Sequence, residues 1–291
     1  MPAATTHVEF ARDVYARLPE ELQKTITDLP MYCLGSQGPD LFFFSRAYFL
    51  PGSLTWVGSR LHGEKVEEVL RWMDAYTKER PLLRSYYAGY LCHYALDSSC
   101  HMIICSYARR EAEQRGCTDS EAHFAIEGEL DIWALRRHSK TPENYSVHDD
   151  LKVSRDAAVK LARMYNLMLL EIFGIYISER KLLEAIFGIH RLTRALKPGS
   201  LMKYRVADRM ENLLRMPKLI TGMMLDGKGA KDPDVLNPDH LVYANVDYPE
   251  LTDSHSFAEL YDLAEEKAAA LFADLDSVPI DTDFNGNPIQ K

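Results

Sequence analysis

The stretch Tyr86 to Ala108, YYAGYLCHYALDSSCHMIICSYA, decides the fold. It is apolar on all sides and contains no proline, so it predicts a helix buried in the core. Its one formally charged residue is Asp97, with His93 four positions before it and His101 four positions after it. Residues four apart lie on one face of a helix, so these three side chains point the same way. Because burying an unpaired carboxylate is costly, Asp97 needs charged partners or a metal ion.

The composition fits a soluble protein with a substantial core. The chain has 291 residues, of which 46% are hydrophobic and 26% are charged. Its net charge of −9 argues against a broad basic surface for duplex nucleic acid. The first residues, MPAATTHVEFARDV, show neither the basic nor the apolar part of a signal peptide, so we expect a cytoplasmic protein.

Two further features bear on the compartment. The stretch 86–108 is long enough to span a bilayer, but its carboxylate, histidines and serines would be costly there, so we expect no transmembrane segment. The cysteines are odd in number and form no CxxC pair, which indicates reduced, buried thiols rather than thiolate-bound zinc. They are Cys33, Cys92, Cys100, Cys105 and Cys117.

The periodicity of the chain is helical almost throughout, and the fold class is therefore all-α. We expect a single domain over 1–291, with metal-site helices in 1–140, supporting helices and a long loop in 141–275, and a polar tail in 276–291. The predicted helices begin near His7, cover 61–77, begin again at Pro81, and cover 118–137, 153–174, 178–196, 201–225 (interrupted at Pro217) and 256–275. Capping boxes are expected at Thr6/Glu9, Thr118/Glu121 and Ser256/Glu259, and loops at 51–60 and 226–253.

A second set of polar side chains recurs at helical spacing. His123, Glu127 and Asp131 lie every four residues along one side of the helix expected at 118–137. His and carboxylate clusters at this spacing are typical of metal sites between the helices of a bundle. Taken singly, a His–Glu pair four apart also occurs on solvated faces. Asp131 is either a partner that orients His123 or a neighbouring ligand, or a solvated carboxylate.

Three more residues complete the candidate set. His7 and His62 lie on the inward faces of their predicted helices, and Asp40 follows Gly38 and Pro39 at a predicted helix start. Each alone fits an ordinary structural role, such as a core histidine hydrogen-bonded to a carbonyl. Their joint occurrence with the two four-residue clusters favours a metal centre.

The ordered set resembles the zinc-dependent phospholipase C family, which shares its helical fold with the single-strand-specific zinc nucleases. The pieces are His7, Gly-Pro-Asp ending at Asp40, His62, HxxxD ending at Asp97, His101, and HxxxE ending at Glu127. The segment AGYLCHYALDSSCH is the most specific of them, and LNPDHLVYANVDYP with SFAELYDLAEEKA resembles the C-terminal part of the compact intracellular members. Nothing in the sequence resembles the membrane-binding β-sandwich of the toxin-type members.

The resemblance implies two to three Zn²⁺ ions and a ligand set. One zinc would bind Asp40, His62, His93 and Asp97, and a second would bind His101, His123 and Glu127. A third would bind His7, share Asp97, and use the amine and carbonyl of the first residue of the mature chain. The secreted relatives begin there with a Trp. Here the chain begins Met1-Pro2, so either Pro2 is exposed by removal of Met1 and chelates, or the third zinc is missing.

The resemblance implies phosphodiester hydrolysis, most specifically phospholipase C-type cleavage of a phospholipid head group. The attacking water would be activated at a di- or trinuclear zinc site. Asp40 would orient or deprotonate that water. Two alternatives remain open. One is a nuclease or nucleotidase acting on single strands, which needs an aromatic stacking pocket. The other is an all-α binding or regulatory domain without activity. The sequence gives no indication of protein partners.

Overall fold

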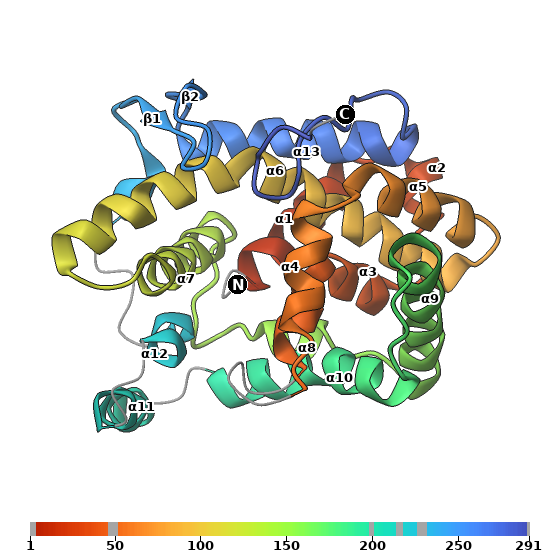
Figure 1. Ribbon diagram of the computed structural model, residues 1–291, viewed down its shortest axis with the longest axis horizontal. Coiled ribbons are helices and arrows are strands. Elements are labelled where there is room, and N and C mark those ends of the chain that lie inside the picture. Colours follow the sequence, from red (N-terminus) through yellow and green to blue (C-terminus); the bar gives the residue numbers. More distant parts are fainter. Residues whose placement is uncertain (1–3, 46–51, 198–200, 214–217, 226–231, 290–291) are drawn as a thin grey trace.

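The computed structural model describes residues 4–45, 52–197, 201–213, 218–225 and 232–289, and it is all-α apart from one small hairpin (Figure 1). The helices of the first half are α1 (Ala4–Arg17), α2 (Glu20–Gln23), α3 (Leu29–Gly35), the 3₁₀ helix η1 (Gly38–Phe44), α4 (Thr55–Gly63), α5 (Val66–Thr77), α6 (Pro81–Arg115) and α7 (Asp119–Arg137). The second half holds α8 (Val147–Asp150), α9 (Arg155–Phe173), α10 (Glu179–Leu196), α11 (Leu201–Leu213), α12 (Leu219–Met223), η2 (Asp234–Leu236) and α13 (Phe257–Ala273). Strands β1 (Tyr243–Ala244) and β2 (Thr252–Asp253) pair antiparallel.

Helix α6 is the axis of the molecule. It packs against α1, α3, α5, α7 and α13, so neighbours cover it on several sides. In Figure 1, α13 lies along α6 although the two are far apart in the sequence. Every residue from Ser85 to Asp97 is buried. The prediction of a core helix that begins at Pro81 is confirmed. No helix among the described residues is both long and apolar enough to cross a membrane.

Two glycines let α3 and α6 approach closely. A Cβ atom on Gly89 would lie 2.0 Å from the carbonyl oxygen of Tyr32, and one on Gly35 would lie 2.0 Å from that of Tyr86. Real side chains cannot come so near, so the contact between the helices requires glycine at both positions. This contact sits one helical turn before His93 and therefore sets where that side chain lies relative to η1.

Several sequence predictions agree with the structure. The capping boxes at Thr118/Glu121 and Ser256/Glu259 are both present, at the starts of α7 and α13. Helices α9 and α10 begin and end within two residues of the predicted positions. The helix predicted over 201–225 corresponds to α11 and α12, and the residues around Pro217 fall outside the described part of the chain.

The first capping box was predicted wrongly. Helix α1 already begins at Ala4, and Thr6 donates from its backbone N and its Oγ1 to Asp131 Oδ1, at 2.7 and 2.8 Å. Glu9 is fully buried and pairs with Lys140 at 2.6 Å. Thr6 therefore bonds to the Asp131 carboxylate, 125 positions away, instead of forming a capping box with Glu9.

The prediction of a loop over 51–60 followed by one helix over 61–77 was also wrong. Residues from Thr55 onward are helical in α4, and a second helix, α5, begins at Val66. The two are separated at Lys65, whose backbone is left-handed with φ 52°. The apolar residues expected to face the core, such as Val69 and Met73, are buried as predicted.

Part of the stretch after α13, predicted as a polar tail over 276–291, is packed against the helices. After α13 the chain turns back over α6, and Ile280, Asp283 and Phe284 are buried. Phe284 has no exposed surface. The last described residues therefore belong to the same packed structure as the helices of the first half.

Candidate metal centre

The structure brings the predicted ligands together from five helices. His7 comes from α1, Asp40 from η1, His62 from α4, three residues from α6 and two from α7. The residues from the last two helices are His93, Asp97, His101, His123 and Glu127. Three groups among these eight have potential ligand atoms within 4.8 Å of one another: His7–Asp40–His93, His62–His93–Asp97 and His101–His123–Glu127.

Asp97 is the hub of the arrangement. Its carboxylate lies 3.0 Å from His93 Nε2, 3.4 Å from His7 Nε2 and 3.8 Å from His62 Nε2. His101 Nδ1 is 3.6 Å from the same carboxylate. Four imidazoles around one buried carboxylate provide the partners that the lone charge in the central helix required.

Backbone carbonyls fix the orientation of three of these rings. His93 Nδ1 lies 2.9 Å from Ser36 O, His62 Nδ1 lies 2.7 Å from Gly58 O, and His101 Nδ1 lies 2.7 Å from Phe284 O. A carbonyl oxygen only accepts, so Nδ1 carries the proton in each ring and Nε2 is the remaining ligand atom. Histidines that bind metals characteristically donate their other nitrogen in this way.

The resulting cluster is balanced only when protons or metal ions lie among its imidazoles and carboxylates. In a neutral His93 ring, Nε2 presents a lone pair toward an Asp97 oxygen at 3.0 Å, and this buried nitrogen has no hydrogen-bond partner among the residues that the structure describes. Asp40 Oδ1 is also buried, and within the described part of the chain its near polar neighbour is His62 Nε2, 3.1 Å away. Lone pairs at such distances repel unless a proton or a metal ion lies between them. Imidazole nitrogen and carboxylate oxygen are ligand types of catalytic zinc, so the residues fit this ion.

The pKa values of the cluster reflect the same close packing of buried imidazoles and carboxylates. Burial lowers the pKa of His93, but the charges of Asp97 and Asp40 outweigh it and the pKa is raised. For Asp97, burial favours the neutral acid, yet His93, His101 and His7 hold the pKa of its carboxyl well below the usual range. Without metal, protons on His93 and His62, whose pKa values are both raised, balance the carboxylates. A bound metal ion would replace these protons.

His7 differs from its neighbours. Burial and the nearby His93 lower the pKa of His7 to about 4, so its ring is neutral at pH 7. It stacks on the ring of His93, with centroids 4.2 Å apart. Nδ1 of His7 is buried and has no hydrogen-bond partner among the described residues. A neutral imidazole with a lone pair directed at the cluster is ready to bind a metal ion.

The Gly-Pro-Asp motif is explained by close contact with His93. Gly38 has φ +48°, and a Cβ atom there would lie 2.3 Å from Cδ2 of the His93 ring. Pro39 then occupies the first turn of η1, and Asp40 follows in the same turn. Glycine is needed for both the backbone conformation and the space, and it allows Asp40 to reach the histidines of α4 and α6.

The third group lies toward the end of α6. His123 Nε2 is 3.1 Å from Glu127 Oε1 on α7, and the rings of His101 and His123 are 5.6 Å apart. His123 is partly exposed while Glu127 is buried. This group therefore reaches toward the protein surface, whereas the groups around His93 are enclosed.

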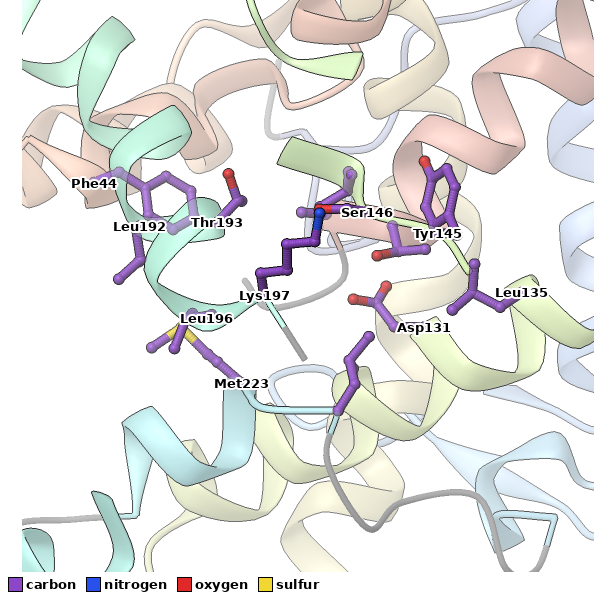
Figure 2. Close-up of a pocket in the computed structure, with 14 residues that line it drawn as sticks. Phe44, Asp131, Leu135, Tyr145, Ser146, Leu192, Thr193, Leu196, Lys197 and Met223 are labelled. Atoms are coloured by element: carbon purple, nitrogen blue, oxygen red, sulfur yellow. The ribbon is translucent and has the colours of Figure 1, made fainter. Parts of the chain in front are cut away.

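Two predicted site residues need separate comment. Asp131 is buried and accepts hydrogen bonds, but from Thr6 on α1 rather than from His123, so it anchors the helix that carries His7. It also lines a largely apolar pocket of ≈ 50 Å³ with Leu135 and Leu196 (Figure 2). This volume is small beside the roughly 300–1,000 Å³ of ordinary ligand sites. Pro2, the predicted N-terminal chelator, lies outside the described residues.

Sequence reasoning missed the groups that orient the ligands. The carbonyl oxygens of Ser36, Gly58 and Phe284 belong to the backbone, which every residue type shares, so no pattern identifies them. Only Gly58 could have been suggested by spacing, because it precedes His62 by one helical turn. Phe284 gave no local signal at all.

Comparison with known families agrees with this geometry. The sequence model of a family described as "Zinc dependent phospholipase C" matches residues 6–181, which is more than half of the chain. All eight residues of the three groups fall within the matched part, whereas Phe284 lies beyond it. No curated protein and no solved structure matches the chain.

Proposed function

The chain belongs to the zinc-dependent phospholipase C family, and on this premise we propose that it is a zinc-dependent phosphodiesterase whose specific activity is phospholipase C-type cleavage of a phospholipid head group. The proposal is supported by one observation: eight His, Asp and Glu side chains from five helices, Asp97 among them, lie together in three groups. One zinc would bind Asp40, His62, His93 and Asp97. The remaining ligand assignments are those implied by the sequence, with His7 sharing Asp97, and His101, His123 and Glu127 forming the other site.

Charge explains why an acidic protein would bind a phosphodiester here. Zinc, when bound, supplies positive charge for the phosphate oxygens and lowers the pKa of a water molecule at its open position. Asp40, Asp97 and Glu127 contribute three negative charges, fewer than the charge of two or three Zn²⁺ ions. The pocket would therefore be locally positive within a chain of net charge −9.

Asp40 is the group that we propose to orient or deprotonate the attacking water. Its Oδ1 is buried and, apart from His62 Nε2 at 3.1 Å, meets no hydrogen-bond partner among the described residues, so a lone pair remains to accept a proton. Burial would raise the pKa of Asp40, but His93 and His62 lower it, which leaves the carboxylate a weak base. We expect Asp40→Asn to lower turnover roughly 10²–10⁴-fold, the usual range for losing a general base. Full turnover by this variant with all zinc bound would exclude the role.

The decisive experiment measures metal content and substrate choice together. We expect purified protein, prepared without chelators, to contain two or three zinc ions by elemental analysis and to hydrolyse phosphatidylcholine. Sequencing the N-terminus of the same sample would show whether Pro2 is the first residue. His123→Ala should lower the zinc content by about one ion, because its site would keep two of three side chains. His138→Ala is the matched control, since His138 ends the same helix and pairs with Asp13 at 3.1 Å.

Each other outcome has a defined meaning. Protein without zinc under these conditions would reject the enzymatic proposal and favour a non-catalytic binding domain. Zinc-containing protein that cleaves single-stranded DNA but not phosphatidylcholine would replace the phospholipase assignment with a nuclease.

A further inference from the structure

The last described residues return to the proposed metal centre. The backbone N–H of Phe284 donates to the carbonyl oxygen of His62 at 3.0 Å, and the carbonyl oxygen of Phe284 accepts from His101 Nδ1 at 2.7 Å. His101 and Phe284 are 183 positions apart in the sequence. One residue near the end of the chain thus contacts two proposed zinc ligands through its backbone, on two different helices.

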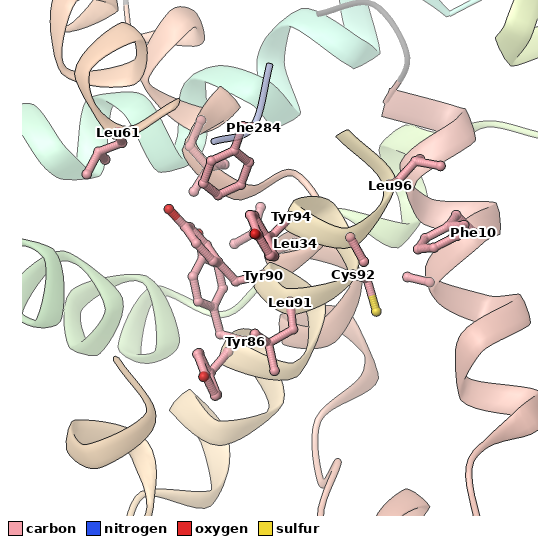
Figure 3. Packing of buried hydrophobic residues seen from close by; sticks show 14 of the residues in the cluster. Phe10, Leu34, Leu61, Tyr86, Tyr90, Leu91, Cys92, Tyr94, Leu96 and Phe284 are labelled. Atoms are coloured by element: carbon pink, nitrogen blue, oxygen red, sulfur yellow. The ribbon is translucent and has the colours of Figure 1, made fainter. Parts of the chain in front are cut away.

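The side chain of Phe284 anchors this contact. Its ring is fully buried and lies 5.3 Å from the ring of His62 and 5.6 Å from that of His93, measured between centroids. Tyr94 packs edge-on against it at 5.2 Å, and Tyr90 does so at 5.8 Å. Figure 3 shows Phe284 with these tyrosines beside α6. The ring fills the space behind the histidines, so the backbone of Phe284 cannot move away without opening a cavity.

The surrounding turn holds the backbone of Phe284 in one conformation. Asp283 Oδ1 accepts from the backbone N–H groups of Asn285 and Asn287, at 2.8 and 2.9 Å. Tyr94 on α6 donates its hydroxyl to the carbonyl of Thr282 at 3.0 Å, and Asn287 Nδ2 donates to Asp247 Oδ2 at 3.1 Å. The turn is thereby tied both to itself and to two other parts of the molecule.

His101 depends on this turn more than the other histidines do. The acceptor for His62 lies in its own helix, and the acceptor for His93 lies just before η1. For His101 the acceptor, Phe284, lies 183 positions further along the chain, and the Asp97 carboxylate is more distant from Nδ1, at 3.6 Å. Without Phe284, His101 would lose the bond that keeps the proton on Nδ1 and directs Nε2 toward His123.

We propose that residues 281–289 form a C-terminal latch, in which Phe284 is a positioning residue that fixes the ring orientation and tautomer of His101 and supports His62. The inference rests on the proposed zinc centre and deepens it. The centre is then built from both ends of the chain, and the part that the family match covers is incomplete without the latch. Partners of this kind typically change metal affinity 10–100-fold when they are removed.

The test compares two buried phenylalanines in the full-length protein. Phe284→Ala removes the anchor of the latch. Phe257→Ala is the matched control, because Phe257 is equally buried and packs edge-on against Trp133, away from the proposed ligands. We expect zinc titration of the chelator-treated proteins to show affinity at the His101 site 10–100-fold weaker in Phe284→Ala and unchanged in Phe257→Ala. If an alanine variant does not fold, the pair Phe284→Leu and Phe257→Leu gives the same comparison with a smaller loss.

A second readout does not depend on zinc. Imidazole ¹⁵N NMR of the metal-free protein, recorded at a pH where the His101 ring is neutral, should show its proton on Nδ1 in the wild type and a mixture of tautomers in the Phe284 variant. A wild-type tautomer and wild-type zinc affinity in that variant would overturn the latch while leaving the zinc centre intact. Wild-type protein that binds no zinc would instead overturn the proposed function, and the NMR result would still decide whether the latch orients His101.

Discussion

At the scale of single residues, two buried carboxylates on neighbouring helices have opposite environments. Asp97 is surrounded by imidazoles, which keep it ionised. Asp131 accepts two hydrogen bonds from Thr6, but burial raises the pKa of Asp131 to about 7, and the nearby charge of Glu127 acts in the same direction. The first carboxylate is suited to bind a cation, and the second acts as a structural acceptor for the start of α1.

Replacing Asp131 by Asn tests this assignment. Because the folded pKa of about 7 exceeds the unfolded value of 3.8, the folded protein holds a proton between these values that the unfolded chain releases. The stability from the protonated group is present at low pH and is lost as the pH rises toward 7. Both bonds from Thr6 end on one oxygen, which an Asn amide also supplies. We therefore expect Asp131→Asn to gain on the order of 4 kcal/mol relative to wild type between pH 4 and pH 8.

Urea denaturation of both proteins at the two pH values measures this difference. Asp239→Asn is the control, because Asp239 is exposed and its replacement removes the same charge from the surface. Equal pH dependence in wild type and Asp131→Asn would show that Asp131 is not the titrating group.

At the scale of elements, a close backbone approach links α3 to α6 at Gly35 and Gly89. Helical periodicity predicted α6, but no sequence pattern predicted a helix at α3 or showed that these two glycines face one another. The same limit explains the errors at Thr6 and Lys65. Sequence patterns predict helix caps and lengths from neighbouring residues. In the structure, Thr6 bonds to the distant Asp131, and the left-handed backbone at Lys65 separates α4 from α5.

We expect Gly89→Ala to destabilise the fold by about 1–3 kcal/mol or more, because the added methyl would meet backbone at 2.0 Å and the helices would have to separate. Thermal unfolding followed by circular dichroism measures the loss. Gly63→Ala is the control, since the nearest atom to its added Cβ is a side-chain oxygen of Asp283 at 3.7 Å. A Gly89→Ala protein as stable as wild type would disprove the close packing of α3 on α6.

At the scale of the whole molecule, the candidate centre joins α1, η1, α4, α6 and α7, and the C-terminal latch adds the other end of the chain. The site that would hold a metal ion is assembled from all these elements, so it exists only in the folded state. Metal binding should therefore contribute directly to stability.

Zinc should raise the melting temperature of chelator-treated protein, and the gain should grow with zinc concentration. At 100 times the dissociation constant, one bound ion stabilises the folded state by about 2.7 kcal/mol. Differential scanning calorimetry with and without zinc measures this effect. Mg²⁺ at the same concentration is the control, because it prefers oxygen ligands and should shift the melting temperature far less. An unchanged melting temperature with zinc would contradict a metal centre that joins these helices.

The sequence by itself determined the all-α class, the buried central helix and the residue types of the centre. These follow from local periodicity, because residues four apart share a face wherever a helix forms. Only the tertiary structure decided which groups orient those side chains: the carbonyl of Ser36 for His93, the carbonyl of Phe284 for His101, and Thr6 for Asp131. These partners are separated by 57, 183 and 125 positions. The two acceptors, the carbonyl oxygens of Ser36 and Phe284, are backbone atoms that every residue has. Their roles therefore arise only when packing brings the distant segments together.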